Sequence, residues 1–286
     1  MSKLKKALEK AKETRELEGK TVTGKDYKNY QQTNGKASKN FDDCRPELNI
    51  KYSNTKIKKI EDHILKKGKV ISLFHDIEKI DQIKTLRTQV LSKLQEIGGN
   101  SLLITSANPY EGKTFTTINL GVSIAQELDR TVLIVDADLK NHSNFNHHKS
   151  FGKDFFGTNM DEGLSNYLLE QAELKDLLIN PGIERLVLLP AGRTLPNSAE
   201  MLGSPRMEKL INDIKCRYPL DRIIIFDSSS LLKSADPLVL SRYVDGILLV
   251  VEEEKTTIED LEKVNELLKD KPVIGTVMNK TKSMVD

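Results

Sequence analysis

The sequence contains no tryptophan, only two cysteines, and no apolar run that approaches the roughly 18 residues needed to cross a membrane. Cys44 and Cys216 are isolated and lack the spacing of metal ligands. This scarcity argues against a disulfide framework and is typical of a reducing compartment. The N-terminal residues lack the apolar centre of a signal peptide. We therefore expect a cytoplasmic protein that meets a membrane only through a partner.

Positive charge is concentrated near the N-terminus. Residues 1–70 hold 19 Lys and Arg against 10 Asp and Glu, although the net charge of the whole chain is only +2. Such a segment can meet nucleic acid or anionic lipid, but the interspersed acidic residues favour a solvated surface. No nucleic-acid partner is expected.

Periodicity divides the chain into two parts. Residues 3–18 place apolar side chains in a narrow stripe at helical spacing and predict a short amphipathic helix, whereas residues 19–54 are polar and predict a flexible linker. We assign residues 1–70 to a basic N-terminal extension and residues 71–286 to one folded domain.

Short apolar runs alternate with helix-length segments in that domain. A predicted helix over 79–97 comes first, and further helices begin at Ser204-Pro205 and at Thr257. Continuously apolar strands between helices indicate an α/β fold with a parallel sheet covered on both faces. The predicted strands are 101–105, 131–135, 185–189, 222–226, 246–251 and 273–278.

The segment from Ala107 to Thr114 matches a phosphate-binding loop, G-x-x-x-x-G-K-[ST], in all but its first position. It follows a predicted strand and opens a predicted helix, as such a loop must. Backbone N–H groups near Glu111 and Gly112 would bind phosphate, Lys113 would neutralise it, and Thr114 would ligate Mg²⁺. If Ala107 needed a positive φ, its methyl group would cost about 1–2 kcal/mol.

Carboxylates follow two other predicted strands. Asp136 and Asp138 end the second strand of the domain, and Asp227 ends the fourth. Ligands of α/β proteins bind at the carboxyl ends of strands, and clustered carboxylates repel one another unless a cation separates them. The sequence therefore predicts an Mg²⁺ site beside the phosphate loop, with a helix cap or turn as the alternative role of Asp138.

The motifs SANPYEGKT, LIVDADLK, LPAGRTLPNSAEMLGSPRM, RIIIFDSSS and VIGTVMNK together resemble the cytoplasmic domain of bacterial tyrosine kinases (BY-kinases) of exopolysaccharide synthesis, over residues 75–282. The N-terminal segment is loosely similar to soluble autokinases encoded beside exosortase-type loci. The resemblance implies a P-loop fold that binds ATP and Mg²⁺. It implies catalytic roles for Lys113, Asp136 and Asp138, and metal ligation by Thr114, Asp136 and Asp227. It also implies nucleotide contacts from the loop, namely from Ala107, Asn108, Glu111, Gly112, Lys113, Thr114 and Phe115.

The resemblance also implies partners. In the family, an acidic-x-x-Arg-x-x-Arg motif docks into a neighbouring protomer; here Asp81, Lys84 and Arg87 occupy its positions, with a solvated charge stripe as the alternative. A transmembrane polysaccharide co-polymerase is the expected activator, which would recruit the protein to the inner face of the membrane. Lys140 stands where the family usually has Arg, and so lacks the bidentate fork.

One family feature is missing. The family's C-terminal tyrosine cluster is absent, because the last tyrosine is Tyr243. Tyr27 and Tyr30, in the predicted linker, are alternative acceptors. An ATPase switch or a nucleotide-sensing adaptor without kinase activity remains the alternative function. Related ATPases that partition DNA carry a signature lysine where this chain has Asn108, which favours the kinase.

Three smaller signals stay open. Asn279, after the last strand, would contact adenine or form a turn. Asp236-Pro237 would shape a phosphate-sensing loop or simply begin a helix. His142, His147 and His148 lie in a polar segment without the spacing of a zinc site and predict a loop.

Overall fold

The computed structural model describes residues 55–74, 77–140, 151–217 and 222–281. The chain divides into two units, Met1–Cys44 and Arg45–Asp286, and all described residues belong to the second. The predicted N-terminal helix and linker lie outside the described residues, as do Tyr27, Tyr30, His142, His147 and His148.

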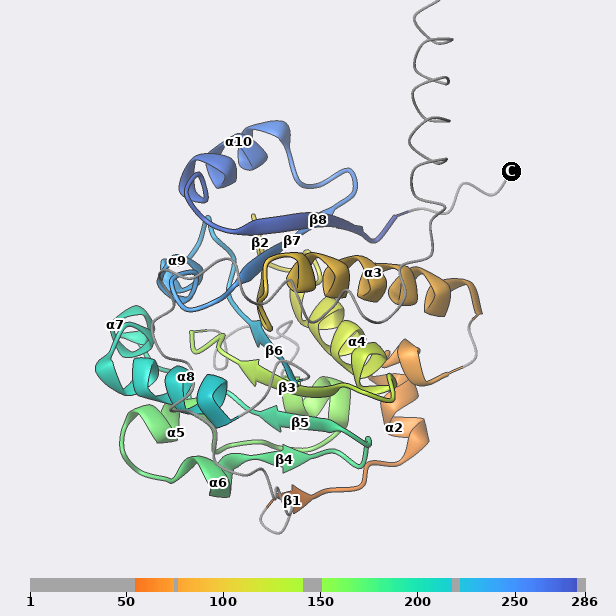
Figure 1. The fold of residues 1–286 in the computed structure, drawn as a ribbon, viewed down its shortest axis with the longest axis vertical. Helices are drawn as coiled ribbons and strands as arrows, with labels where there is room; N and C mark the ends of the chain where they lie inside the picture. Colours follow the sequence, from red (N-terminus) through yellow and green to blue (C-terminus); the bar gives the residue numbers. More distant parts are fainter. Residues whose placement is uncertain (1–54, 75–76, 141–150, 218–221, 282–286) are drawn as a thin grey trace, which may run out of the picture. The chain divides into compact units, whose positions relative to one another are not determined.

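The described residues form one eight-stranded sheet with the order β1-β4-β5-β3-β6-β2-β7-β8 (Figure 1). Neighbouring strands are parallel except for the β4–β5 pair. The predicted α/β fold with a mostly parallel sheet is confirmed. The strands are β1 (Lys56–Ile57), β2 (Ser101–Ser106), β3 (Thr131–Asp136), β4 (Ile179–Asn180), β5 (Leu186–Leu189), β6 (Arg222–Asp227), β7 (Gly246–Glu252) and β8 (Val273–Asn279).

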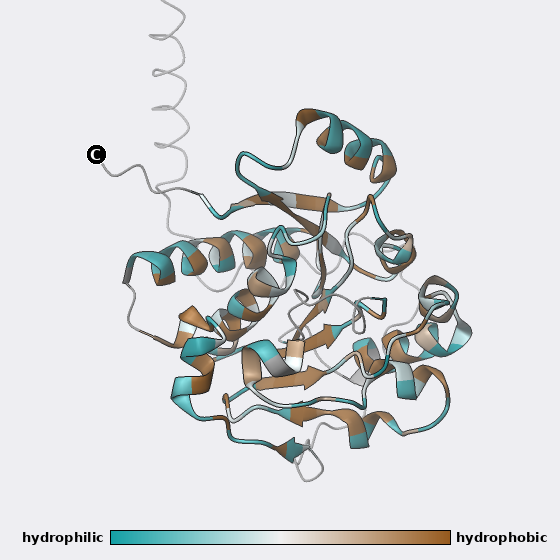
Figure 2. Ribbon diagram, turned by 180° about the vertical axis from the view of Figure 1, so that it is seen from behind, coloured by the Kyte–Doolittle hydropathy of each residue, from teal (hydrophilic) through white to brown (hydrophobic). Residues whose placement is uncertain are grey.

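Each face of the sheet supports its own core. Along β2, Leu102 and Ile104 pack into one apolar cluster, whereas Leu103 between them packs into the other. This alternation follows from the two-residue repeat of a strand, and because both faces are covered the central strands are apolar throughout. Figure 2 shows the strands mainly in the hydrophobic colour, flanked by helices of mixed character.

Helices α3 and α4 contribute to one core, and α8 and α10 contribute to the other. Ser204 and Thr257 accept backbone N–H groups at the starts of α8 and α10, as the sequence predicts. The helices are α2 (Asp62–Lys67), η3 (Ile71–Leu73), α3 (Ile77–Glu96), α4 (Lys113–Ala125), η4 (Phe151–Phe155), α5 (Leu164–Leu168), α6 (Leu174–Leu177), α7 (Ser198–Leu202), α8 (Pro205–Arg217), α9 (Asp236–Leu240) and α10 (Ile258–Leu267).

The predicted domain boundary at residue 70 differs from this arrangement. β1 pairs with β4 at the edge of the sheet, and Leu65 and Val70 are buried in the core that contains α4. Residues 55–70 are rich in lysine, so their few apolar side chains gave no pattern from which burial could be predicted. In the described part of the chain, no helix has both the length and the apolar character of a membrane span.

Candidate active site

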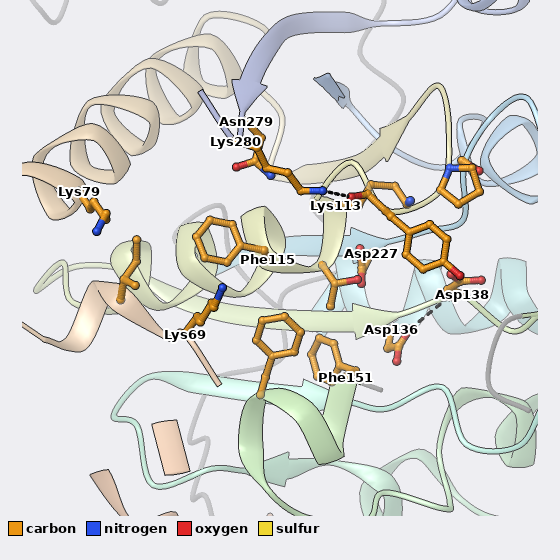
Figure 3. A pocket seen from close by; sticks show the side chains of 17 residues that line it. Lys69, Lys79, Lys113, Phe115, Asp136, Asp138, Phe151, Asp227, Asn279 and Lys280 are labelled. Carbon is orange, nitrogen blue, oxygen red and sulfur yellow. Dashed lines mark hydrogen bonds between the residues drawn. The ribbon is translucent and has the colours of Figure 1, made fainter. Parts of the chain in front are cut away.

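A cavity of about 640 Å³ lies where β2, β3 and β6 end (Figure 3). These strands are neighbours in the sheet, so the segments that follow them meet although they are distant in sequence. Eight predicted site residues line the cavity, namely Gly112, Lys113, Thr114, Phe115, Asp136, Asp138, Asp227 and Asn279. The other three, Ala107, Asn108 and Glu111, do not line it.

The phosphate loop joins β2 to α4, and its unusual backbone conformations fall near its end. Gly112 has a φ of 99°, and a Cβ there would lie 1.8 Å from the amide nitrogen of Asn279. The positive φ favours glycine at this position, and any larger residue would have to displace the Asn279 side chain. Tyr110 has a φ of 68°, in the left-handed region that bulky residues rarely adopt.

Ala107, which departs from the glycine of the sequence pattern, is buried and has no positive φ. The predicted strain at its methyl group is therefore absent. Its carbonyl oxygen accepts the N–H of Leu232 at 3.1 Å, which joins the start of the loop to the segment after β6. A small apolar side chain suits this buried position.

The end of β8 holds the loop from the other side. The Asn279 side-chain amide donates to the carbonyl oxygen of Glu111 at 2.9 Å, and Lys280 Nζ donates to that of Tyr110 at 2.7 Å. Lys280 Nζ also lies 3.0 Å from a carboxylate oxygen of Glu252. We call Asn279, Lys280 and Glu252 the brace. The sequence analysis missed Lys280, although it directly follows the predicted Asn279.

Glu111 and Asn108 shape the loop from within. The buried Glu111 carboxylate accepts the Asn108 backbone N–H at 2.9 Å and the Thr256 hydroxyl at 2.6 Å. The Asn108 side chain in turn donates to Asp260, on α10, at 2.8 Å. These side chains are used in contacts within the protein, so direct nucleotide binding by Asn108 and Glu111 stays a prediction that would have to come from their backbone.

Lys113 begins α4, with its side chain only 8% exposed, near the carboxylates of the cavity (Figure 3). Burial lowers the pKa of its ammonium, and the negative charges of Asp227, Asp138 and Glu111 oppose that effect. A buried cation at a helix N-terminus, facing a cavity, is the arrangement that binds phosphate.

Asp136 and Asp227 are register partners at the ends of β3 and β6. Burial, and then the neighbouring carboxylate charges, raise the pKa of Asp136 and that of Asp227 to about 8. Thr114 and Thr117 donate hydrogen bonds to Asp227. Like charges confined in a buried pair favour binding of a cation or a proton.

Asp138 lies two residues beyond β3, just before the turn at residues 139–140, and its backbone N–H donates to Asp136 at 3.2 Å. Its charge contributes to the raised pKa of both buried carboxyls. Asp138 lines the cavity and stands outside the helices and turns, which favours the predicted site role over the helix cap or turn predicted as its alternative.

The oxygen donors fit Mg²⁺, which binds proteins through one or two carboxylates and keeps several waters. Asp136, Asp227 and the Thr114 hydroxyl supply hard oxygen ligands without soft competitors. Within the described ranges, no group of three or more His, Cys, Asp and Glu is arranged to hold a metal ion. Metal ligation by Thr114, Asp136 and Asp227 stays a prediction, and Asp138 lines the same cavity beside them.

Asp236 starts α9 rather than lining the cavity, which favours the helix start predicted as one of its two roles. It is fully buried and accepts the Ser198 hydroxyl at 2.8 Å. Lys140, which follows the Asp136–Asp138 segment, places its Nζ 3.7 Å from the other Asp236 oxygen. This ion pair connects the turn after β3 to the segment after β6.

Two of the three charged residues predicted to mediate self-association pair with each other, and the third contacts α4. Asp81 and Lys84 lie 3.6 Å apart on α3. Arg87 Nε lies 2.9 Å from Glu127, and its guanidinium donates to the Ser123 carbonyl at 2.9 Å. Arg87 therefore has a structural role within the chain, and docking to a neighbour through this face stays a prediction.

Aromatic and basic residues complete the cavity, and the sequence analysis missed them. Phe151 and Phe155 of η4 line it together with Lys69 and Lys79 (Figure 3). No short motif marks them, because they come from segments far from the phosphate loop in sequence.

Comparison with known proteins identifies the family. A family model described as an AAA domain matches residues 110–280. The tyrosine-protein kinase YwqD of Bacillus subtilis is 33% identical over 202 residues, which cover 70% of this chain and 80% of YwqD. The chain belongs to the bacterial tyrosine kinase family of P-loop proteins.

Other members differ in length. The tyrosine-protein kinase wzc of Salmonella typhimurium is 30% identical over 183 residues, 64% of this chain, but the match spans only 24% of wzc. The crystal structure of the VpsO kinase domain superposes with a TM-score of 0.60 at 26% identity, covering 73% of this chain and all of that domain. The similarity is thus to a kinase domain, which is most of YwqD and about a quarter of wzc.

Proposed function

We propose that this chain is an ATP-dependent protein-tyrosine kinase that regulates the synthesis, chain length or export of an exopolysaccharide. The observation that carries the proposal is the meeting of Lys113, at the start of α4, with the buried carboxylates Asp136 and Asp227 in one cavity. The names of relatives agree with it, since YwqD and wzc are tyrosine-protein kinases and one relative is a putative tyrosine-protein kinase of a cps region in Klebsiella pneumoniae.

The site residues divide the work of phosphoryl transfer. The backbone N–H groups around Gly112 and the start of α4 would bind the ATP phosphates, with Lys113 neutralising their charge. Asp136, Asp227 and Thr114 would hold Mg²⁺, which supplies charge neutralisation when bound. Asp138 would help position the acceptor hydroxyl. Phosphoryl transfer requires mainly positioning and electrostatic stabilisation, so these groups suffice.

Partners and location belong to the proposal as well. A transmembrane polysaccharide co-polymerase would activate the kinase and recruit it from the cytoplasm to the inner face of the membrane. Self-association would use the face of α3 that carries Asp81 and Lys84, both of which are exposed. Because Arg87 is held by Glu127, its participation would require that ion pair to open.

The test uses the purified protein with Mg²⁺, ATP and a synthetic Glu-Tyr copolymer as acceptor. We expect phosphotyrosine to form, and to disappear with Lys113→Met, which keeps most of the length of the buried side chain and removes its charge. A matched control is Lys255→Met, which changes an exposed lysine outside the cavity. Release of phosphate without phosphotyrosine would contradict the kinase and support the ATPase switch.

A further inference from the structure

The phosphate loop carries a tyrosine where it faces the cavity. Tyr110 is 48% exposed and lines the same cavity as Lys113, Asp136 and Asp138. It stands three positions before Lys113 in the chain. An exposed phenol so close to the predicted position of the ATP phosphates is an unusual feature for a loop whose backbone must approach a ligand closely.

The other tyrosines that the structure describes lie in different surroundings. Tyr167 is 6% exposed, and its ring lies 4.6 Å from the Arg206 guanidinium carbon. Tyr243 is partly buried and lies beside Arg242, and neither tyrosine lines the cavity. Of the three tyrosines within the described ranges, Tyr110 alone combines exposure with a place in the cavity.

The backbone at Tyr110 supports a functional role. Its φ of 68° costs an aromatic residue about 1–2 kcal/mol relative to glycine. Lys280 Nζ donates to the Tyr110 carbonyl oxygen at 2.7 Å, so the brace fixes the residue in this conformation. Strained residues that the surrounding structure holds in place are concentrated at functional sites.

We propose that Tyr110 is an acceptor of the kinase's own reaction, phosphorylated within the same chain by the ATP bound to that chain. The inference rests on the proposed kinase function and names one substrate of it. The Tyr110 phenolic oxygen attacks the γ-phosphorus of ATP, and the bond from that phosphorus to the β,γ-bridging oxygen breaks. ADP leaves with the bonding electron pair, and the phenolic proton passes to water in the open cavity.

Phosphorylation would also limit further turnover. The phosphate would add nearly two negative charges to a cavity that already holds three carboxylates. We therefore expect the modified protein to bind ATP more weakly than the unmodified protein.

The experiment mixes wild-type protein with the inactive variant Lys113→Met, adds Mg²⁺, ATP and the Glu-Tyr copolymer, and maps phosphotyrosine after digestion with trypsin. The wild-type chain yields the peptide 94–113, in which Tyr110 is the only tyrosine. The variant lacks the cleavage site at residue 113 and yields the peptide 94–130, again with Tyr110 alone. The two peptides therefore report separately on the two chains.

The proposal predicts phosphotyrosine on peptide 94–113 and none on peptide 94–130. Tyr243→Phe, the control, should leave phosphorylation of peptide 94–113 unchanged. Modification of peptide 94–130 would overturn transfer within one chain. A phosphorylated copolymer without modified peptide 94–113 would overturn Tyr110 as an acceptor but leave the kinase standing. If neither the copolymer nor Tyr110 is phosphorylated, the proposed function fails, and this inference fails with it.

Discussion

Acidic side chains lie at both ends of the parallel strands, and the folded protein shifts their pKa values in opposite directions. Asp245 directly precedes β7, at the amino ends of the strands. It accepts hydrogen bonds from the Ser101 hydroxyl at 2.6 Å and from Lys215 at 3.0 Å. Burial opposes its ionisation, but these donors and the Asn100 N–H outweigh burial and lower the pKa of Asp245. Its negative charge is stabilised by the folded protein.

At the carboxyl ends of the strands, burial and neighbouring carboxylates have the larger effect on the pKa values. They raise the pKa of Asp136 and of Asp227, even though Thr114 and Lys113 favour the charged form of Asp227. A carboxylate that stabilises the fold is surrounded by donors, whereas this pair is destabilised in its charged form until a ligand binds. Perturbed carboxyl groups in a cavity are typical of functional sites.

The largest effect is expected at Lys113. Lys113→Met should reduce tyrosine phosphorylation by about a hundredfold or more, because the developing charge on the transferred phosphoryl group loses its buried cation. Initial rates at saturating ATP would measure it. Retention of most of the activity would mean that the cavity does not house the reaction.

The two acidic sites can be separated by matched substitutions. Asp136→Asn should lower kinase activity by about a hundredfold without destabilising the protein, since it relieves repulsion in a buried pair. Asp245→Asn should destabilise the fold by about 1–3 kcal/mol, because buried donors lose a charged acceptor, while activity per folded molecule persists. Urea unfolding and initial rates would be measured on both variants. Loss of stability in Asp136→Asn with loss of activity in Asp245→Asn would refute the comparison.

The comparison also predicts a dependence of stability on pH. Asp136 and Asp227 each have a pKa raised to about 8 in the folded protein, whereas the ordinary pKa of an Asp side chain is 3.8. Their contribution to the free energy of unfolding is therefore largest below about pH 4 and decreases as the pH rises to about 8. Without Mg²⁺ and nucleotide, Asp136→Asn should exceed the wild type in stability by about 1–3 kcal/mol near pH 8.

That difference should shrink toward pH 4, and urea unfolding at a series of pH values would measure it. Parallel curves for the two proteins would show that the pair does not bind the protons assigned to it.

The smallest effect is expected at the brace. Lys280→Met removes the donor to the Tyr110 carbonyl, so the loop should lose its fixed conformation and the KM for ATP should increase severalfold, with a smaller change in kcat. Lys255→Met is the matched control, because Lys255 Nζ lies 3.1 Å from the same Glu252 and contacts no loop carbonyl. Equal effects of the two substitutions would attribute the change to the charge of Glu252 alone.

Much of this site could be predicted from sequence because local patterns encode it. The six apolar runs predict the strands, and the Gly-Lys-Thr sequence predicts that the site lies at their carboxyl ends, where Lys113, Asp136 and Asp227 meet. Strands β1 and β4 were missed because two paired residues each leave no periodicity to detect.

The brace and the conformation of Tyr110 depend on contacts between distant segments. The residues near Tyr110 in sequence do not predict its positive φ, because the hydrogen bond to its carbonyl oxygen comes from Lys280, after β8. The sequence pattern has glycine at the position of Ala107, and this predicts backbone strain only if the glycine is needed for a positive φ. In the structure, Ala107 is buried and has no positive φ.

The central claim is that the buried carboxylates at the ends of β3 and β6, together with Lys113, form one site for ATP and Mg²⁺. Calorimetric titration of the purified protein with ATP, in the presence and absence of Mg²⁺, tests it most directly when repeated on Asp136→Asn and Asp245→Asn. We predict binding that strengthens with Mg²⁺, loses that enhancement in Asp136→Asn, and is retained in Asp245→Asn. Absence of ATP binding by the wild type, or equal loss in both variants, would contradict the account.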